Sequence, residues 1–169
     1  MKLVDPIKID ESEFNDFIEE FKSVGEDLVP YSLNQKELGF EAYVASLGDE
    51  SLGKGIRADW VPASTYFLLD DEGKIYGAVN IRHSLTEKLR IEGGHVGYGI
   101  KPSARNQGHG TEILRLAMDK VRELGIKRVL ITCDKKNPHS ARIITKNGGK
   151  LDSEIEKDNK TVQRYWIHL

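Results

Sequence analysis

The chain has 169 residues, of which 31% are charged, and its formal net charge is −2. This length is enough for one domain with a hydrophobic core and too short for two ordinary domains, so we expect a single domain over residues 1–169. The nearly balanced charge gives no general nucleic-acid-binding surface. The lone cysteine, Cys133, excludes a disulfide framework and a cysteine-based metal site.

The sequence carries no signal for a membrane or a metal. It has no N-terminal apolar segment of the signal-peptide type and no run of about 20 apolar residues. The five histidines are scattered and lack the HExxH spacing of a zinc site. We expect a cytoplasmic protein with no metal and with no membrane or nucleic-acid partner.

The first part of the chain predicts a short edge strand over residues 1–4 and then two helices. Residues 11–24 have apolar side chains at helical spacing and are followed by Gly25, which is typical of a helix end. Residues 35–47 predict the second helix. The side chains expected to face the core are Phe14, Phe17, Ile18 and Phe21 in the first helix and Leu38, Phe40, Ala42 and Ala45 in the second. Residues 48–63 predict a long loop, a kind of segment that is often functional in a compact domain.

The apolar pattern then changes to the period of a strand. Residues 64–69 and 75–83 predict a hairpin, whose acidic turn is closed by Gly73. Residues 84–94 are polar and end in two glycines, so they predict a loop. Residues 95–100 predict the next strand.

The strongest helical pattern lies over residues 108–124, with Ile113, Ala117, Val121 and Leu124 at helical spacing and Gly125 as its cap. The remaining predicted elements are a strand over residues 128–133, a helix over 138–147 and two strands over 150–156 and 161–169. The strand–helix–strand unit of residues 95–133 favours a parallel pair with a right-handed crossover. We therefore expect an α+β fold, with a mixed, largely antiparallel sheet that contains one splayed parallel pair and is flanked by helices.

A basic, glycine-containing turn, Arg105-Asn106-Gln107-Gly108-His109-Gly110, joins the predicted strand to this long helix. Such a turn exposes backbone N–H groups at a helix N-terminus, where a phosphate or pyrophosphate is favoured. It is not a P-loop, because Thr111 stands where that motif requires a lysine. It is not the dinucleotide fingerprint either, because a GxGxxG motif beginning at Gly97 has Pro102 in its third glycine position.

The turn fits the pattern Q/R-x-x-G-x-G/A and resembles the coenzyme A pyrophosphate loop of the GCN5-related N-acetyltransferase (GNAT) superfamily. Asn137 and Ser140 follow about 30 residues later, as in that family. The similarity covers the second half of the chain well and the first half only in outline. It implies a GNAT-like domain that uses acetyl-CoA as co-substrate.

The resemblance also implies which residues bind the cofactor. Backbone amides from Gln107 to Thr111 would hold the pyrophosphate, and Arg105 would add positive charge. The backbone of Gly99 and Ile100 would pair with the pantetheine amides, and Asn137 would contact the pantetheine arm. The complete expected set is Gly99, Ile100, Arg105, Asn106, Gln107, Gly108, His109, Gly110, Thr111, Asn137 and Ser140.

Acyl transfer from a thioester to an amine needs a neutral amine, an oxyanion donor and a leaving thiolate. A backbone N–H near Ile100 is the candidate oxyanion donor. Glu92 and His95 are the candidate bases. Many family members carry a tyrosine seven residues after the Asn137 position, where this chain has Ile144. The proton donor is therefore either another group, such as Tyr165 or Tyr98, or the thiolate leaves unassisted.

The leading hypothesis is an acetyl-CoA-dependent N-acetyltransferase that acts on a primary amine of a small molecule, peptide or protein. A non-catalytic acyl-CoA-binding sensor or interaction module is the alternative, and a nucleotide-phosphate enzyme is a third. The acids that could recognise a cationic amine are Glu26, Asp27, Asp59 and Glu92, and the predicted loop that carries Trp60 could cover that site. Edge strands at the C-terminus often pair in the GNAT superfamily, so the resemblance makes a homodimer a further expectation.

Overall fold

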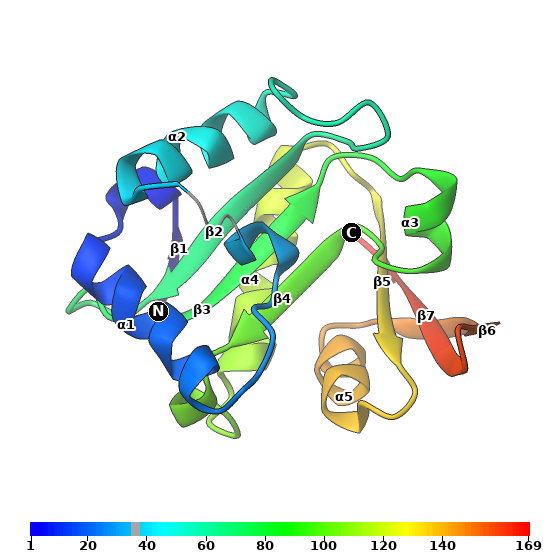
Figure 1. Cartoon of the computed structure of the whole chain (residues 1–169). Coiled ribbons are helices and arrows are strands. Elements are labelled where there is room, and N and C mark those ends of the chain that lie inside the picture. Colours follow the sequence, from blue (N-terminus) through cyan, green and yellow to red (C-terminus); the bar gives the residue numbers. More distant parts are fainter. Residues whose placement is uncertain (35–37) are drawn as a thin grey trace.

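Two antiparallel β-sheets form the centre of the structure, a computed structural model that describes residues 1–34 and 38–169 (Figure 1). The elements in chain order are β1 (Lys2–Val4), η1 (Pro6–Lys8), α1 (Glu11–Ser23), η2 (Tyr31–Asn34), α2 (Phe40–Ser51), β2 (Ala63–Leu69), β3 (Ile75–Arg82), α3 (Glu87–Ile91), β4 (Val96–Ile100), η3 (Pro102–Ala104), α4 (His109–Glu123), β5 (Arg128–Asp134), α5 (Pro138–Lys146), β6 (Lys150–Lys157) and β7 (Lys160–His168). No helix among these described residues is long and apolar enough to cross a membrane.

The two sheets meet at the start of β4 and β5. The larger sheet has the strand order β1-β2-β3-β4 and the smaller one β5-β7-β6, and each neighbouring pair is antiparallel. The amide of His95, just before β4, donates to the carbonyl of Leu130 in β5 at 2.7 Å. Beyond this point β4 and β5 diverge (Figure 1). The expected splayed pair is therefore confirmed as a shared start, without a parallel ladder along its length.

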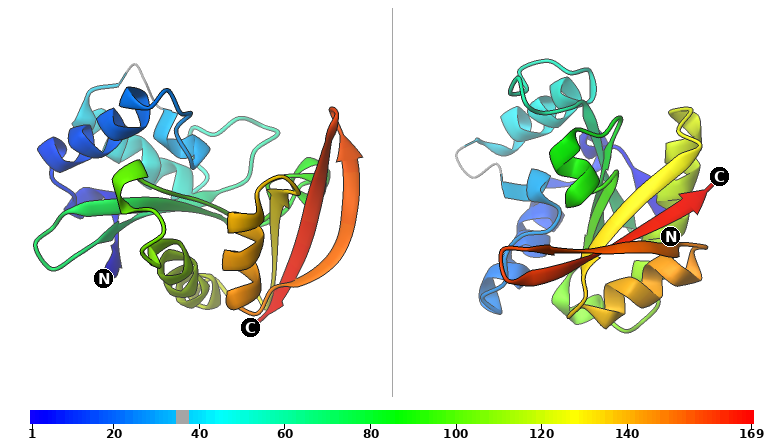
Figure 2. Two further views of the ribbon diagram at one scale, coloured as in Figure 1. Left: turned by 90° about the horizontal axis from the view of Figure 1, so that it is seen from below. Right: turned by 90° about the vertical axis from the view of Figure 1, so that its right-hand side faces the viewer.

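Helices cover the larger sheet on both faces. Figure 2 shows α1 and α2 on one face and α4 on the other, with α5 beside α4 and next to the smaller sheet. Two hydrophobic cores follow from this arrangement: one lies between α1, α2 and the larger sheet, and the other lies around α4. The opening between β4 and β5 is consequently bordered by α5 and by the N-terminus of α4.

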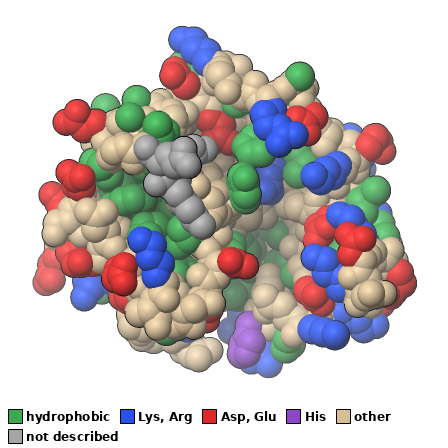
Figure 3. Space-filling model, viewed as in Figure 1, with side chains coloured by type: hydrophobic (Ala, Val, Ile, Leu, Met, Phe, Trp, Pro, Cys, Tyr) green, Lys and Arg blue, Asp and Glu red, His purple; other side chains and the backbone are tan. Residues whose placement is uncertain are grey.

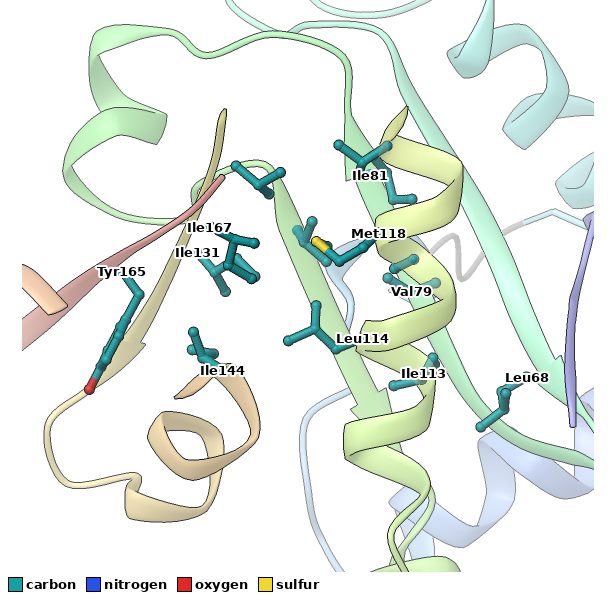
Figure 4. Packing of buried hydrophobic residues seen from close by; sticks show 14 of the residues in the cluster. Leu68, Val79, Ile81, Ile113, Leu114, Met118, Ile131, Ile144, Tyr165 and Ile167 are labelled. Carbon is teal, nitrogen blue, oxygen red and sulfur yellow. The ribbon is translucent and has the colours of Figure 1, made fainter. Parts of the chain in front are cut away.

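The predicted apolar stripe of α4 forms the centre of the second core (Figure 4). Ile113, Ala117 and Val121 are fully buried, together with Ile144 of α5. Leu124 does not belong to this stripe, because it caps the helix C-terminus and is 38% exposed. The helix ends where Gly125 adopts the left-handed conformation (φ 74°), as predicted.

Two local predictions of the first half were wrong. Three of the residues expected to face the core, Leu38 just before α2 and Ala42 and Ala45 within it, are exposed, while Tyr43 and Leu47 are buried. The Tyr43 ring packs at 5.1 Å from Phe14, so aromatic packing decides which face of α2 turns inward. Residues 35–37 of this predicted helix lie outside the described residues. The segment predicted as a loop over residues 84–94 contains α3, whose start is capped by Thr86 accepting from the Leu89 amide.

Candidate active site

The turn before α4 presents a row of free backbone amides. Asn106 (φ 61°) and Gly108 (φ 89°) adopt left-handed conformations that turn the chain into the helix. In the described part of the chain, the amides of residues 106–110 donate to no other residue, whereas the Thr111 amide donates to the Gly108 carbonyl at 3.0 Å. Free amides at a helix N-terminus are the geometry that favours a bound anion. This row of free amides spans Asn106 to Gly110, whereas the expected row was Gln107 to Thr111.

Gly110 allows the close packing of α4 on α5. A Cβ on Gly110 would lie 2.6 Å from Cδ1 of Ile143 in α5, which is too close for a carbon contact. The glycine therefore allows the N-terminus of α4 to lie against α5, the helix that Asn137 caps. The two sequence motifs, 30 residues apart, are brought together by this contact.

Arg105 lies beside the turn, but its charge is already paired. Its two Nη atoms donate to the Glu26 carboxylate at 2.7 and 2.5 Å, and its Nε donates to the Ile100 carbonyl at 3.1 Å. The Arg105 guanidinium lowers the pKa of Glu26 through these hydrogen bonds. Glu26 is therefore occupied with the turn, which removes it from the acids available to recognise a cationic amine.

A cavity of about 440 Å³ lies in the opening between β4 and β5. We call it the gap cavity. In Figure 3 the molecule is hollowed near the middle of the face, between its two halves. The residues that line the gap cavity include Tyr31, Arg82, Glu92, Tyr98, Cys133, Asn137 and Ser140. The expected pantetheine-contacting residues Asn137 and Ser140 thus share one cavity.

The hydrogen-bond register of β4 decides which backbone groups face this opening. The Arg82 amide donates to the His95 carbonyl and the Lys101 amide to the Tyr76 carbonyl, which fixes the alternation along the antiparallel pair. In this alternation the backbone groups of Gly99 point toward β3. Those of Tyr98 and Ile100 point away from β3, and the Ile100 carbonyl accepts from Arg105 Nε on that side. The free edge of β4 is therefore formed by the backbone of Tyr98 and the amide of Ile100, whereas Gly99, which the resemblance also implied, pairs with Ala78 of β3.

A hydroxyl pair spans the opening between the diverging elements. The Tyr98 hydroxyl and the Ser140 Oγ lie 3.2 Å apart, and the Asn137 side chain caps α5 by accepting from the Ser140 amide at 3.0 Å. Burial raises the pKa of Tyr98 to about 12. Burial also raises the pKa of the neighbouring Cys133 thiol, and a hydrogen bond with Ser140 opposes that shift. Of the two tyrosines considered as proton donors, Tyr98 is thus the one that lines the gap cavity.

Glu92 lies at the edge of the gap cavity, where two lysines pair with its negatively charged carboxylate. Lys157 and Lys160, from the hairpin of β6 and β7, contact its carboxylate at 2.5 and 2.7 Å. These hydrogen bonds lower the pKa of Glu92. A carboxylate that is stabilised in its charged form is a weak proton acceptor, so this environment does not favour Glu92 as the base.

His95 joins the two sheets. Its Nδ1 accepts from the Leu130 amide at 2.9 Å, while its own amide donates to the Leu130 carbonyl. Burial lowers the pKa of His95 to about 4, so the ring is neutral at physiological pH. The ring does not line the gap cavity. The geometry therefore gives His95 a structural contact and does not favour it as the base.

Tyr165 packs in the core around α4, near Ile144 and Ile131 (Figure 4). Its hydroxyl donates to Oε1 of Gln163 at 2.9 Å, and burial raises its pKa. Ile144, at the position where many family members have tyrosine, is fully buried in the same core. Neither side chain lines the gap cavity. Of the two candidate proton donors, only Tyr98 reaches it.

A second cavity of about 380 Å³ lies on the α1/α2 side of the larger sheet. We call it the acceptor chamber. Its lining includes residues of α2, β3, α3 and the loop between α2 and β2, among them Trp60. The role of that loop as a cover of the acceptor site stays a prediction. Tyr31 and Arg82 line both cavities and so form the wall between them. The walls of this chamber come from five separate segments of the chain, so no single sequence motif marks it.

The described residues hold no group of three or more His, Cys, Asp or Glu side chains that could bind a metal ion.

No curated protein matches the sequence. Solved structures share the fold at low sequence identity. A ribosomal-protein-S5-alanine acetyltransferase from Vibrio fischeri has a TM-score of 0.69 and 15% identity, covering 99% of this chain and 91% of that one.

Two further structures give similar values. An acetyltransferase of the GNAT family from Streptococcus pneumoniae has a TM-score of 0.64 and 20% identity, covering 99% of this chain and 98% of that one. A spermidine N-acetyltransferase mutant from Vibrio cholerae has a TM-score of 0.64 and 11% identity, covering 99% and 93%. The sequence model of the acetyltransferase (GNAT) domain matches residues 10–150, which extends the resemblance into the first half of the chain. The chain belongs to the GNAT family of acetyltransferases.

Proposed function

We propose that this GNAT enzyme transfers an acetyl group from acetyl-CoA directly to a primary amine of a small molecule or peptide. The observation that carries the proposal is the row of free amides from Asn106 to Gly110, at the end of α4 that packs on α5. Asn137 and Ser140, at the start of α5, line the gap cavity. Pyrophosphate is the part of coenzyme A that these amides would hold. The backbone of Tyr98 and Ile100 would pair with the pantetheine amides, and Asn137 lies at the same opening.

The chemistry needs little from the protein beyond position. A neutral amine attacks the thioester carbonyl, and the oxyanion that forms is stabilised by an amide on the free edge of β4. The C–S bond then breaks, and the leaving thiolate takes a hydrogen bond or a proton. A thiol pKa of about 8.5 lies about 3.5 units below the pKa of Tyr98, so full proton transfer from Tyr98 would cost about 5 kcal/mol. We assign Tyr98 the role of a hydrogen-bond donor to the thiolate, supported by Ser140.

Binding tests the cofactor half of the proposal. Isothermal titration of the folded protein with acetyl-CoA is expected to give saturable heat, and ATP is expected not to compete at equal concentration. Absence of heat would contradict the proposal, and competition by ATP would favour the nucleotide-phosphate enzyme. Release of free thiol with a panel of primary amines separates an enzyme from a non-catalytic acyl-CoA-binding module.

A further inference from the structure

The acceptor chamber contains two charged side chains of opposite sign whose binding capacity is not used. Arg82, at the end of β3, is half-buried and holds the carbonyls of Gly93 and Gly94 with Nη1, at 3.0 and 3.2 Å. Its Nε and Nη2 donate to no described residue. These two atoms form one edge of the guanidinium, the geometry that binds a carboxylate through two parallel hydrogen bonds. The backbone contacts fix the guanidinium, so its free edge is held in place for an anion.

Glu50, near the end of α2, is the complementary group. Its carboxylate is half-buried and, within residues 1–34 and 38–169, neither accepts a hydrogen bond nor forms an ion pair. Burial raises the pKa of Glu50, and the Arg82 charge opposes that shift. The two groups therefore feel each other's charge without direct contact. A carboxylate in this state is stabilised by a bound cation.

The other charged residues of the chamber do not pair with Glu50 or Arg82. Arg57 and Asp59 form a bidentate pair with each other, at 3.1 and 3.2 Å. Lys88 lies on α3 and is exposed to solvent, where its charge is screened. Glu50 and Arg82 are left as the two half-buried charges without a complete set of partners. A ligand with only an ammonium group would meet the Arg82 cation, and a ligand with only a carboxylate would meet the Glu50 anion.

The residues that line each cavity indicate where the reacting amine lies. Glu50 lines only the acceptor chamber, Arg82 lines both cavities, and Tyr98 lines only the gap cavity. An ammonium bound to Glu50 remains protonated and cannot attack a thioester. The amine that reacts must therefore be a second amine of the same ligand. It lies at the end of a side chain that runs past Arg82 into the gap cavity.

We propose that the amine acceptor is a free diamino acid, with its α-ammonium at Glu50, its carboxylate at Arg82 and its side-chain amine in the gap cavity. This inference rests on the proposed acetyl transfer. In the reaction the side-chain nitrogen forms a bond to the acetyl carbon and loses a proton to solvent. The C–S bond breaks, and the coenzyme leaves as the thiolate, which solvent then protonates.

Three matched compounds test the assignment: L-lysine, cadaverine, which lacks the carboxylate, and 6-aminohexanoate, which lacks the α-amine. Calorimetric binding to the protein saturated with coenzyme A is expected to be at least tenfold tighter for lysine than for either analogue. Mass spectrometry is expected to find the acetyl group on the side-chain nitrogen. Equal binding of cadaverine and lysine, or acetylation of the α-nitrogen, would overturn the proposal.

Two substitutions locate the groups on the ligand. Glu50→Gln is expected to weaken lysine at least tenfold and to leave 6-aminohexanoate unchanged, because only lysine has the α-ammonium. Arg82→Lys is expected to weaken lysine and to leave cadaverine unchanged. Asp49→Asn, on the exposed neighbouring residue, is the control and is expected to leave all three compounds unchanged.

If Glu50→Gln weakens the binding of lysine and of 6-aminohexanoate equally, the effect is a general electrostatic one and the assignment is overturned. If acetyl-CoA binds and other amines are acetylated while lysine does not bind, this inference fails and the proposed function stands. If acetyl-CoA itself does not bind, the proposed function fails.

Discussion

Gly108 offers the sharpest test of the anion-binding turn. It adopts φ 89°, and a Cβ at this position would meet no atom within 4 Å. The substitution Gly108→Ala therefore adds no steric contact and acts only through the backbone conformation. A residue with a Cβ pays about 1–2 kcal/mol for the left-handed conformation. In the free protein the turn can relax away from that conformation and lose the alignment of its amides.

Binding of a pyrophosphate must restore the alignment, so the same free energy is lost from the affinity. A loss of about 1–2 kcal/mol corresponds to a Kd for acetyl-CoA that is about 5–30-fold weaker. Gly125 provides a matched control, because it has φ 74° and equally open surroundings at the opposite end of α4. Gly125→Ala is expected to lower the free energy of unfolding by a similar amount and to leave the Kd unchanged. Titration calorimetry on both variants decides the matter. Unchanged affinity in Gly108→Ala, or equal losses in both, would refute the reasoning.

Three further predictions concern the candidate catalytic residues. Tyr98→Phe is expected to lower kcat about 10–100-fold with little change in KM, because a hydrogen bond to a charged group contributes about 1.5–3 kcal/mol; Tyr165→Phe is the control, and a larger loss in the control would contradict the assignment. Glu92→Gln is expected to leave the pH dependence of kcat near neutral pH the same as in the parent, since the two lysines already hold the Glu92 pKa low; a kcat that no longer depends on pH in the variant would restore Glu92 as the base. For His95 the folded pKa of about 4 lies below the ordinary value of 6.5, so the unfolded chain binds more protons between these pH values and the stabilising contribution is lost as the pH falls. It amounts to about 3 kcal/mol, fully present above pH 6.5, and chemical denaturation of His95→Gln against the parent from pH 7 to 4 is expected to show it; parallel stability curves would refute it.

The parts of the fold that depend on local pattern could be predicted from the sequence. The α4 stripe, its Gly125 cap and the turn before it are set by residues within one or two helical turns of each other. The same holds for Asn137 and Ser140, where Asn137 caps the helix that contains Ser140. These are the residues on which the family resemblance depends.

The roles of the charged residues could not be predicted in this way. Glu26 and Arg105 are 79 residues apart, and Glu92 and Lys157 are 65 residues apart, yet each pair is in direct contact. A sequence pattern does not show which of many surface charges will meet across such distances. Glu26 and Glu92 therefore appeared available for substrate recognition or catalysis, although the fold had already paired both. The acceptor chamber has the same origin, because Glu50 and Arg82 come from elements that only the tertiary fold brings together.

Coupled detection of both products is the most direct test of acetyl transfer at the gap cavity. The protein is incubated with acetyl-CoA and a panel of primary amines, and free thiol and acetylated amine are measured in the same sample. We predict equal amounts of the two products, with Gly108→Ala reducing both together at low acetyl-CoA concentration. Tight binding of acetyl-CoA with no thiol released for any amine would contradict the proposal and identify a binding module.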